Sequence, residues 1–278
     1  MAYRDILVHI DHSKTVQGRT TAALRLAQAQ SAQLTGLSVV ELPYIPGYAE
    51  VEIGAEVIML RKEALDAAAD KAGAAFAEQA EAAGVEATWR RVDGNPVDVL
   101  GENSRNHDLL VVSQFDDSAE LLRGGHEMPD RVILSAGRPV LIVPYVYTGA
   151  EIGKRVLIAW DGSRTASRAV HDALPVLISA EEVVVLTVNT GSDDDAAKQA
   201  SGEEIARHLA RHGVNVTSDH LSSADMKVGD VLLSRAADLS SDLIVLGAYG
   251  HARWRELVLG GVTQYMLESM PVPVLMSH

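Results

Sequence analysis

The chain has 278 residues, a hydrophobic content of 47% and a formal net charge of −14, and it contains no cysteine. At roughly 100–200 residues per domain, this length predicts two domains. The lack of cysteine excludes disulfides, thiolate metal sites and thiol catalysis, and the acidic balance disfavours unaided binding to nucleic acid or to an anionic membrane. With no basic segment leading an apolar stretch at the N-terminus, and no apolar run of about 18 residues, we expect a cytoplasmic protein without a signal peptide or a membrane span.

Apolar runs of strand length alternate with helical patterns in the N-terminal half. The runs span residues 5–10, 31–40, 107–112 and 138–143. Helices are expected at 55–83, which ends at Gly84 as a C-terminal cap should, and at 96–105. Strands that alternate with helices, and that are almost continuously apolar, are typical of a parallel sheet covered on both faces. We therefore predict a doubly wound α/β domain.

The C-terminal half repeats this framework. Its apolar runs span residues 155–160, 179–188, 241–246 and 272–276, and its helices are expected at 202–212 and 229–239. The first run of each half ends in a similar triplet, Asp11-His-Ser13 and Asp161-Gly-Ser163. Because long internal repeats indicate repeated structural units, we expect one domain in residues 1–146 and a second in 154–278, joined by a linker at 145–153.

Two loops distinguish the halves. Residues 41–54 form an insert with two prolines and two tyrosines, which either covers a small-molecule pocket or is a surface loop. The second half has an acidic loop, 190–196, with three adjacent aspartates. Those carboxylates either attract a divalent cation or form a solvated loop.

Glycines gather near the end of the chain. Gly247-Ala-Tyr-Gly250 follows the apolar run 243–246, and the pair Gly260-Gly261 comes next. Glycine lets the backbone pass close to a ligand or adopt a positive φ. A strand that ends in glycines, followed by a glycine pair that opens a helix, is a plausible phosphate cradle. The alternative is a tight strand-to-helix turn that binds no ligand.

Over nearly its whole length the chain resembles a tandem universal stress protein. The resemblance depends on the first strand ending at Asp161-Gly-Ser163, the strand 241–247, the Gly-x2-Gly-x9-Gly spacing from Gly247 to Gly260, and the terminal run 271–275. It implies a five-stranded parallel sheet of order 3-2-1-4-5 in each half, with the halves packed as a pseudo-twofold pair through their last strands. It also implies that some members bind ATP, with or without Mg²⁺, at the carboxyl ends of strands one and four.

The family pattern Gly-x2-Gly-x9-Gly-Ser/Thr assigns roles to the glycines of this sequence. By the resemblance, Gly247 and Gly250 let the backbone approach the ribose and phosphates. Gly260, Gly261 and Val262 offer amides to phosphate oxygens at a helix start. The hydroxyl of the family is missing, because Gly261 stands at the Ser/Thr position, so we expect nucleotide binding to be weakened but retained.

The resemblance places further residues in the site. Asp161 contacts the nucleoside and Val188 meets the adenine edge, although Asp161 could instead cap the following helix. Thr263 lies two residues beyond the missing hydroxyl, and whether it substitutes is left open. His251 and Arg253, with Arg255, lie between the glycines, where they either neutralise phosphates or are simply exposed.

The first half departs from the glycine pattern. Ser113, Asp116, His126 and Glu127 occupy the places of the four glycines. The acidic residues would repel a triphosphate and the larger side chains would crowd it. We therefore predict a degenerate site in the first half and one nucleotide site per chain, in the second.

We find no P-loop, nucleophile elbow or catalytic triad, so we expect no enzyme, with a slow ATPase activity left open. His208 and His212 have a spacing that can bind a metal, but they also suit the C-terminal dipole of a helix. The predicted function is ATP binding by a stress or regulatory protein. The alternative is an interaction module that acts through protein contacts or a small ligand. The sequence leaves the protein partner and a homodimer undecided.

Overall fold

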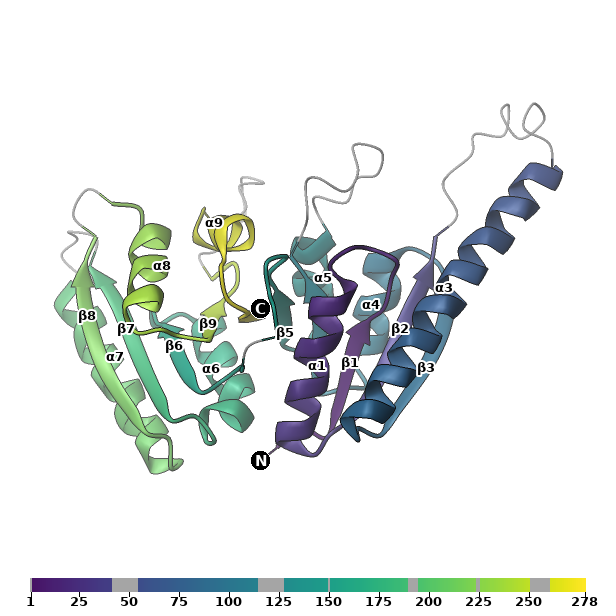
Figure 1. Cartoon of the computed structure of the whole chain (residues 1–278). Helices are drawn as coiled ribbons and strands as arrows, with labels where there is room; N and C mark the ends of the chain where they lie inside the picture. Colours follow the sequence, from purple (N-terminus) through teal and green to yellow (C-terminus); the bar gives the residue numbers. More distant parts are fainter. Residues whose placement is uncertain are drawn as a thin grey trace.

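The computed structural model describes residues 2–41, 55–114, 128–149, 151–189, 195–223, 226–250 and 261–278. Within them the strands form one sheet, of order β3-β2-β1-β4-β5-β10-β9-β6-β7-β8 (Figure 1). The strands are β1 (Asp5–His9), β2 (Gln33–Val40), β3 (Ala87–Asp93), β4 (Leu109–Ser113), β5 (Val140–Val143), β6 (Arg155–Ala159), β7 (Glu182–Asn189), β8 (Val216–Ser222), β9 (Leu243–Gly247) and β10 (Val274–Ser277).

Each half of the sheet is parallel and has the order 3-2-1-4-5. The halves meet where β5 pairs with β10 in antiparallel fashion, with Leu141 opposite Leu275. We call β1–β5 with their helices the N-terminal half, and β6–β10 with theirs the C-terminal half. Because the two last strands pair with each other, neither is left as an open apolar edge.

Helices cover both faces of the sheet. They are α1 (Val16–Gln30), α3 (Ala55–Ala83), α4 (Pro96–Ser104), α5 (Met128–Ala136), α6 (Arg164–Leu177), α7 (Asp195–Arg211), α8 (Val228–Asp238) and α9 (Gly261–Ser269). Helices α1, α3, α6 and α7 share one face, and α4, α5, α8 and α9 share the other (Figure 1). The predicted C-cap at Gly84 is confirmed by its φ of 65°, and Gly213 follows α7 in the same way with a φ of 83°.

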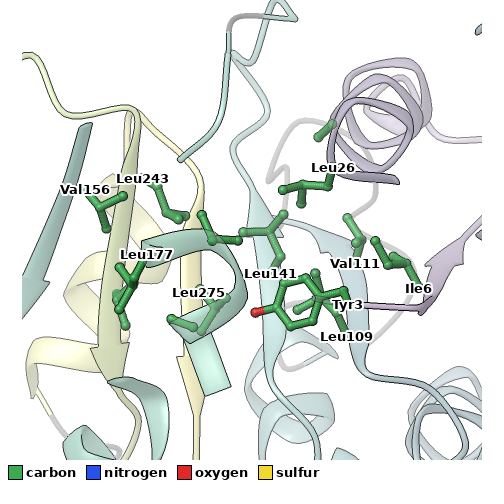
Figure 2. Close-up of a cluster of buried hydrophobic side chains, with 14 of the residues drawn as sticks. Tyr3, Ile6, Leu26, Leu109, Val111, Leu141, Val156, Leu177, Leu243 and Leu275 are labelled. Atoms are coloured by element: carbon green, nitrogen blue, oxygen red, sulfur yellow. The ribbon is translucent and has the colours of Figure 1, made fainter. Parts of the chain in front are cut away.

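The apolar runs are explained by burial on both faces. In β5, Leu141 and Val143 belong to one core cluster, and Val140 and Ile142 belong to the other. Figure 2 shows the first cluster, which passes from Ile6 in the N-terminal half through Leu141 and Leu275 into the C-terminal half without interruption. Each fully buried side chain of this kind contributes about 1.5–3 kcal/mol to folding.

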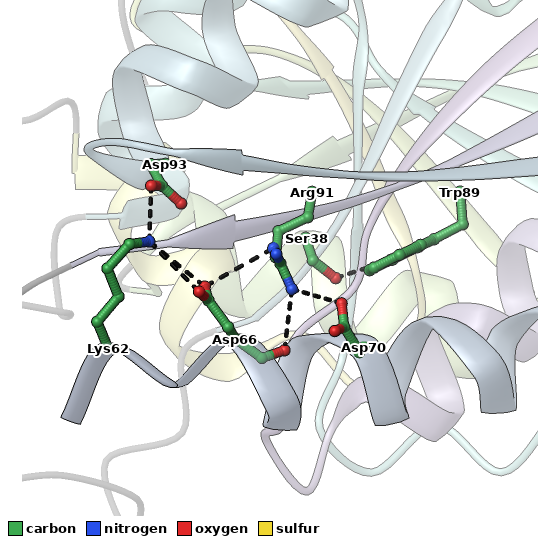
Figure 3. A network of polar contacts seen from close by, with 7 residues as sticks. All are labelled: Ser38, Lys62, Asp66, Asp70, Trp89, Arg91 and Asp93. Carbon is green, nitrogen blue, oxygen red and sulfur yellow. Dashed lines mark hydrogen bonds and ion pairs between the residues drawn. The ribbon is translucent and has the colours of Figure 1, made fainter. Parts of the chain in front are cut away.

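The outer strands β3 and β8 differ from the central ones, because each of their residues is either partly buried or exposed and none is fully buried. An ion-pair network fastens α3 to β3 (Figure 3). Lys62 Nζ lies 2.8 Å from a carboxylate oxygen of Asp93, and Arg91 contacts Asp66 and Asp70. Such half-exposed pairs contribute about 0–1 kcal/mol each, so they fix the position of α3 more than they stabilise it.

The close contact between α3 and β3 depends on a glycine. A Cβ at Gly73 would lie 2.3 Å from the ring of Trp89, so the indole lies flat against the helix backbone. The indole nitrogen of Trp89 donates to Ser38 Oγ at 3.0 Å (Figure 3).

Hydrogen bonds also cross between the halves on the α1 and α6 face. The phenol of Tyr3 donates to the main-chain oxygen of Asp172 at 2.7 Å, and Gln30 Nε2 donates to the oxygen of Pro175 at 3.1 Å. None of the described helices is long and apolar enough to cross a membrane.

Candidate functional site

The C-terminal half has a topological switch point where β6 and β9 lie side by side. The helix after β6 is α6, whose Val170 packs into the first core cluster, and the helix after β9 is α9, whose Met266 packs into the second. The chain therefore leaves the two strands toward opposite faces of the sheet. Open α/β sheets bind ligands at the carboxyl ends of such strands. We call this edge the second switch point, and its counterpart between β1 and β4 the first.

Asp161 lies in the turn between β6 and α6. Its Oδ1 accepts the backbone N–H of Ser163 at 2.9 Å, and Gly162 between them has a φ of 74°. Ser163 is the N-cap of α6, because its Oγ accepts the N–H of Ala166 at 3.1 Å. The alternative that Asp161 caps the helix is therefore wrong, and its carboxylate stands exposed at the switch point.

Gly247 and Gly250 contact the first turn of α6. A Cβ at Gly247 would lie 2.3 Å from the nitrogen of Ala166 and 2.5 Å from the carbonyl carbon of Thr165. A Cβ at Gly250 would lie 2.6 Å from Thr165 Oγ1 and 2.8 Å from Ser163 Oγ. The predicted approach of this backbone to a ribose and phosphates stays a prediction, whereas the approach that the structure shows is to the first turn of α6.

Gly261 begins α9 and has a different environment. A Cβ there would meet none of the described residues within 4 Å, so their packing does not require a glycine. Val262 is partly buried against the second core cluster. Thr263 is only 4% exposed, and its Oγ1 accepts the N–H of Tyr249 at 3.3 Å. The Thr263 hydroxyl is therefore engaged in holding the end of β9.

Val188 lies at the flank of the switch point. It is in β7, which pairs with β6 such that Leu186 stands opposite Ala159. Val188 is therefore level with the turn that holds Asp161, and it is partly exposed. Gly260 lies outside the described residues, as do the basic residues between the glycines.

The first turns of α6 and α9 converge on the loop after β9. Gly250 touches α6 and Tyr249 is bonded to α9. The first four N–H groups of a helix have no partner within that helix, and a helix N-terminus carries about half a positive charge. Two such ends beside bare main chain favour an anion such as a phosphate.

The first switch point is organised differently. Arg19 of α1 is 1% exposed and reaches both strands. Its Nη1 donates to Ser113 Oγ at 2.8 Å and its Nη2 to Asp11 Oδ1 at 2.8 Å. The same oxygen of Asp11 accepts the N–H and the hydroxyl of Ser13 at 3.0 and 2.6 Å. A protein side chain therefore fills the place where the second switch point presents small residues.

Burial and charge set the ionisation of this cluster. Burial alone would raise the pKa of Asp11, but Arg19, His9 and the hydrogen bonds from Ser13 outweigh it and hold that pKa well below its usual range. Burial lowers the pKa of His9 to about 4, although Asp11 acts in the opposite direction. At neutral pH the cluster is therefore an ion pair between the buried Arg19 and the partly exposed Asp11, beside a neutral imidazole.

Arg19 was missed in the sequence, although its periodicity carried a signal. Arg19, Ala23, Leu26 and Gln30 recur on one face of α1, and all are buried. A charged residue in that series has to find a buried partner. Of the first-half residues named for the degenerate site, Ser113 is described and bonded to Arg19, and the other three lie outside the described residues.

The remaining candidates do not join the site. The rings of His208 and His212 lie 4.7 Å apart at the end of α7, and the described residues contain no group of three or more potential metal ligands. A groove of about 360 Å³ lies between α6 and α7, lined in part by Arg164, His171 and His208, but by none of the predicted site residues. The insert after β2 and most of the acidic loop lie outside the described residues.

Comparison with known proteins finds the same family in both halves of the chain. The sequence model of the universal stress protein family matches residues 2–144 and again 153–278. A universal stress protein of Synechocystis sp. is 26% identical over 187 residues, an alignment that covers 64% of this chain and 61% of that relative. The chain thus aligns with less than two thirds of the length of this relative.

Solved structures show the same fold across the whole chain. A universal stress protein from Archaeoglobus fulgidus superposes with a TM-score of 0.79 at 19% identity, covering 99% of this chain and 96% of that one. A putative universal stress protein from Pseudomonas aeruginosa gives a TM-score of 0.63 at 15% identity, with 99% and 93% coverage. At these identities the likeness concerns the fold alone.

Proposed function

The chain belongs to the universal stress protein family, and from that premise we propose that its C-terminal half binds ATP, with or without Mg²⁺, at the second switch point. One observation carries the proposal, namely that the first turns of α6 and α9 converge on the loop from Gly247 to Gly250. Main-chain amides and two helix N-termini then face the same edge, and each such end stabilises a nearby negative charge by about 0.3–1 kcal/mol.

The residues around this edge have complementary tasks in the proposal. The amides of Gly261 and Val262, at the start of α9, bind phosphate oxygens. The exposed carboxylate of Asp161 accepts hydrogen bonds from ribose hydroxyls, since an ionised carboxylate is an acceptor only. Val188 meets the adenine edge from the neighbouring strand. Gly260 belongs to the same set by the family pattern.

We propose binding and regulation rather than catalysis, in a cytoplasmic protein. Asp161 already accepts the amide of Ser163, which orients it for contact with the nucleoside rather than for activation of a water molecule. Slow hydrolysis of ATP is tested by phosphate release, compared between the wild type and Gly250→Val.

The N-terminal half takes no nucleotide in this proposal. Arg19 is buried there and is bonded to both Asp11 and Ser113, so a ligand would have to displace an intact ion pair. We therefore expect one nucleotide per chain.

A second candidate function has an observation in its favour. Because Gly247 and Gly250 are already required by contact with α6, their presence alone does not demand a ligand. The alternative is an interaction module of the same fold that acts through protein contacts or a small ligand.

Calorimetric titration of ATP, with and without Mg²⁺, into wild type and Gly250→Val decides between the two. We expect one site in the wild type and none in the variant. Ala82→Val is the matched control, since Ala82 is exposed in α3 of the other half and its helical backbone accepts a side chain. Lack of heat in the wild type contradicts nucleotide binding. Equal heats in wild type and Gly250→Val contradict the location of the site.

A further inference from the structure

Tyr249 has an unusual backbone for its residue type. It lies between the two glycines of the loop after β9, and its φ is 56°. A residue with a Cβ rarely adopts this left-handed conformation, so the surroundings have to hold it there. The conformation of Tyr249 decides where Gly250 lies against the first turn of α6.

Contacts from α9, from α5 and from the C-terminal residue His278 hold Tyr249. Its N–H is bonded to Thr263 in α9, and its ring stands edge-on to that of His278 with 6.2 Å between the centroids. Its phenol donates to Asp130 Oδ1 at 2.7 Å, and Asp130 belongs to α5 of the N-terminal half. Burial and the neighbouring Asp130 both raise the pKa of Tyr249 above its usual value, so the phenol remains a donor at neutral pH.

A second hydrogen-bonded link joins the same parts of the two halves. Gln114, which follows β4 in the N-terminal half, is 3% exposed. Its Nε2 donates to the main-chain oxygens of Leu267 and Glu268, at 2.8 and 3.1 Å, in the last turn of α9. Its Oε1 accepts the N–H of Tyr145 at 3.2 Å, so its amide is fixed from both sides.

These links connect equivalent segments of the two halves. Gln114 directly follows β4, and Asp130 is in the first turn of α5, so they bracket the β4–α5 connection of the N-terminal half. Their partners, Tyr249 and the end of α9, belong to the β9–α9 unit of the C-terminal half. The N-terminal half thus contacts this unit just after β9 and at the end of α9.

We infer that the N-terminal half is a regulatory half, in which Asp130 and Gln114 position the β9–α9 unit and thereby set the affinity of the second switch point for nucleotide. The inference rests on the proposed function and deepens it. Tyr249 is a positioning residue, since its phenol is directed to Asp130 and acts on the ligand only through Gly250 and α9. A change that moves α5 changes nucleotide affinity, and by linkage nucleotide binding shifts the preferred position of α5 by the same free energy.

The test uses the full chain and titration with MgATP. Tyr249→Phe and Asp130→Ala each remove one partner of the same hydrogen bond. A hydrogen bond to a charged group is strong enough that we expect affinity to fall about tenfold in each variant. The double variant should bind no more weakly than Asp130→Ala alone, because Asp130→Ala already removes the hydrogen bond that Tyr249→Phe removes. Asp130→Asn keeps an acceptor oxygen and should recover part of the affinity.

Tyr3→Phe is the matched control. It also removes a phenol hydrogen bond that crosses between the halves, the bond to Asp172, but it touches neither the loop nor α9. Its nucleotide affinity should equal that of the wild type. Equal affinities of wild type, Tyr249→Phe and Asp130→Ala would overturn the inference, as would an equal loss in Tyr3→Phe.

A second readout works without nucleotide and separates this inference from the proposed function. Amide hydrogen exchange across residues 248–250 should be faster in Asp130→Ala than in the wild type, and unchanged in Tyr3→Phe. If the wild type binds no nucleotide but exchange quickens, the proposed function is wrong and the positioning of the loop stands. Unchanged exchange in Asp130→Ala would overturn the positioning itself.

Discussion

The two switch points of this molecule have the same arrangement of strands and helices but different residues at the strand ends. Arg19 stands eight residues after Asp11, and Ala169 stands at the same distance after Asp161. Ser113 ends β4, and Gly247 ends β9. In the N-terminal half a buried guanidinium connects the strand ends. In the C-terminal half Ala169 and Gly247 have no side chain that could fill this space, so the N-termini of two helices lie beside the main chain of the loop after β9. The comparison teaches that a few positions decide what occupies a switch point of this fold. Either a side chain of the protein bonds to the strand ends, or main-chain N–H groups remain there for a ligand.

The largest expected effect on the free energy of unfolding comes from removing the Arg19 side chain at the first switch point. Arg19→Ala leaves the partly buried Asp11 carboxylate without its cation. Removing one partner of a fully buried pair typically costs about 3–5 kcal/mol, so we expect a loss near the lower end of that range. Arg25→Ala, in the same helix but exposed, should change stability by less than about 0.5 kcal/mol. Urea denaturation of both variants measures the difference. Equal stabilities would mean that Arg19 does not hold the first switch point together.

The second prediction concerns pH and again separates the halves. His9 has a folded pKa of about 4, below its unfolded value of about 6.5, so the unfolded state binds the proton more readily. Stability should therefore be fully present above pH 6.5 and be lost as the pH falls from about 6.5 to about 4, by about 3 kcal/mol at most.

The control for pH is His9→Ala, which gives the first half the residue that the second has at Ala159. It should be less stable at neutral pH but should lose this part of the pH dependence. The low pKa of Asp11 adds a separate loss below about pH 4, which the variant retains in part. A wild-type stability that stays constant between pH 6.5 and 4 would contradict a neutral buried His9.

The third prediction separates the two kinds of glycine in the second switch point. Gly247→Ala places a Cβ 2.3 Å from a backbone nitrogen, so we expect a loss of about 1–3 kcal/mol through overpacking. The Cβ of Gly261→Ala meets none of the described residues within 4 Å, so this variant should lie within about 0.5 kcal/mol of the wild type. Thermal unfolding of the two variants measures this. Similar melting temperatures would show that β9 does not depend on its approach to α6.

The smallest expected effect is a gain. Gly261→Ser restores the hydroxyl of the family pattern, and no described residue lies within 4 Å of the added Cβ. One neutral hydrogen bond contributes about 0.5–1.5 kcal/mol, so ATP affinity should rise about two- to tenfold. Gly261→Ala controls for the loss of backbone freedom. If both variants bind as the wild type does, phosphate oxygens do not reach this position.

The main architecture could be predicted because its signals are repeated and apolar. The central strands read as continuous apolar runs, since they are buried on both faces, and the family resemblance supplied their order. The third strands, β3 and β8, were not identified, because an edge strand that is half exposed has a weak alternating pattern. The helix expected at 202–212 begins at Asp195 instead. Gly202 was interpreted as a boundary, but it lies inside α7, where a Cβ would be 2.6 Å from Thr187 Cγ2.

The candidate site was predicted in part. The sequence indicated Asp161 and the glycines, and the structure brings those that it describes to one edge of the sheet. It could not indicate that Thr263 is bonded to Tyr249, or that Tyr249 reaches Asp130, because these contacts depend on how the halves pack. The packing role of Gly247 was equally hidden, since a sequence does not say which partner a bare backbone approaches.

The antiparallel seam between β5 and β10 has a consequence for the asymmetry of the molecule. Two separate subunits joined at such a seam would dissociate on dilution. If the subunits were identical, their two switch points would also be identical. Here the seam lies within one polypeptide, so the partners stay at a fixed ratio of one to one at any dilution. A single substitution therefore changes one switch point and leaves the other unchanged. Because both halves belong to one polypeptide, every copy of the protein keeps one switch point filled by Arg19 and one that presents main chain.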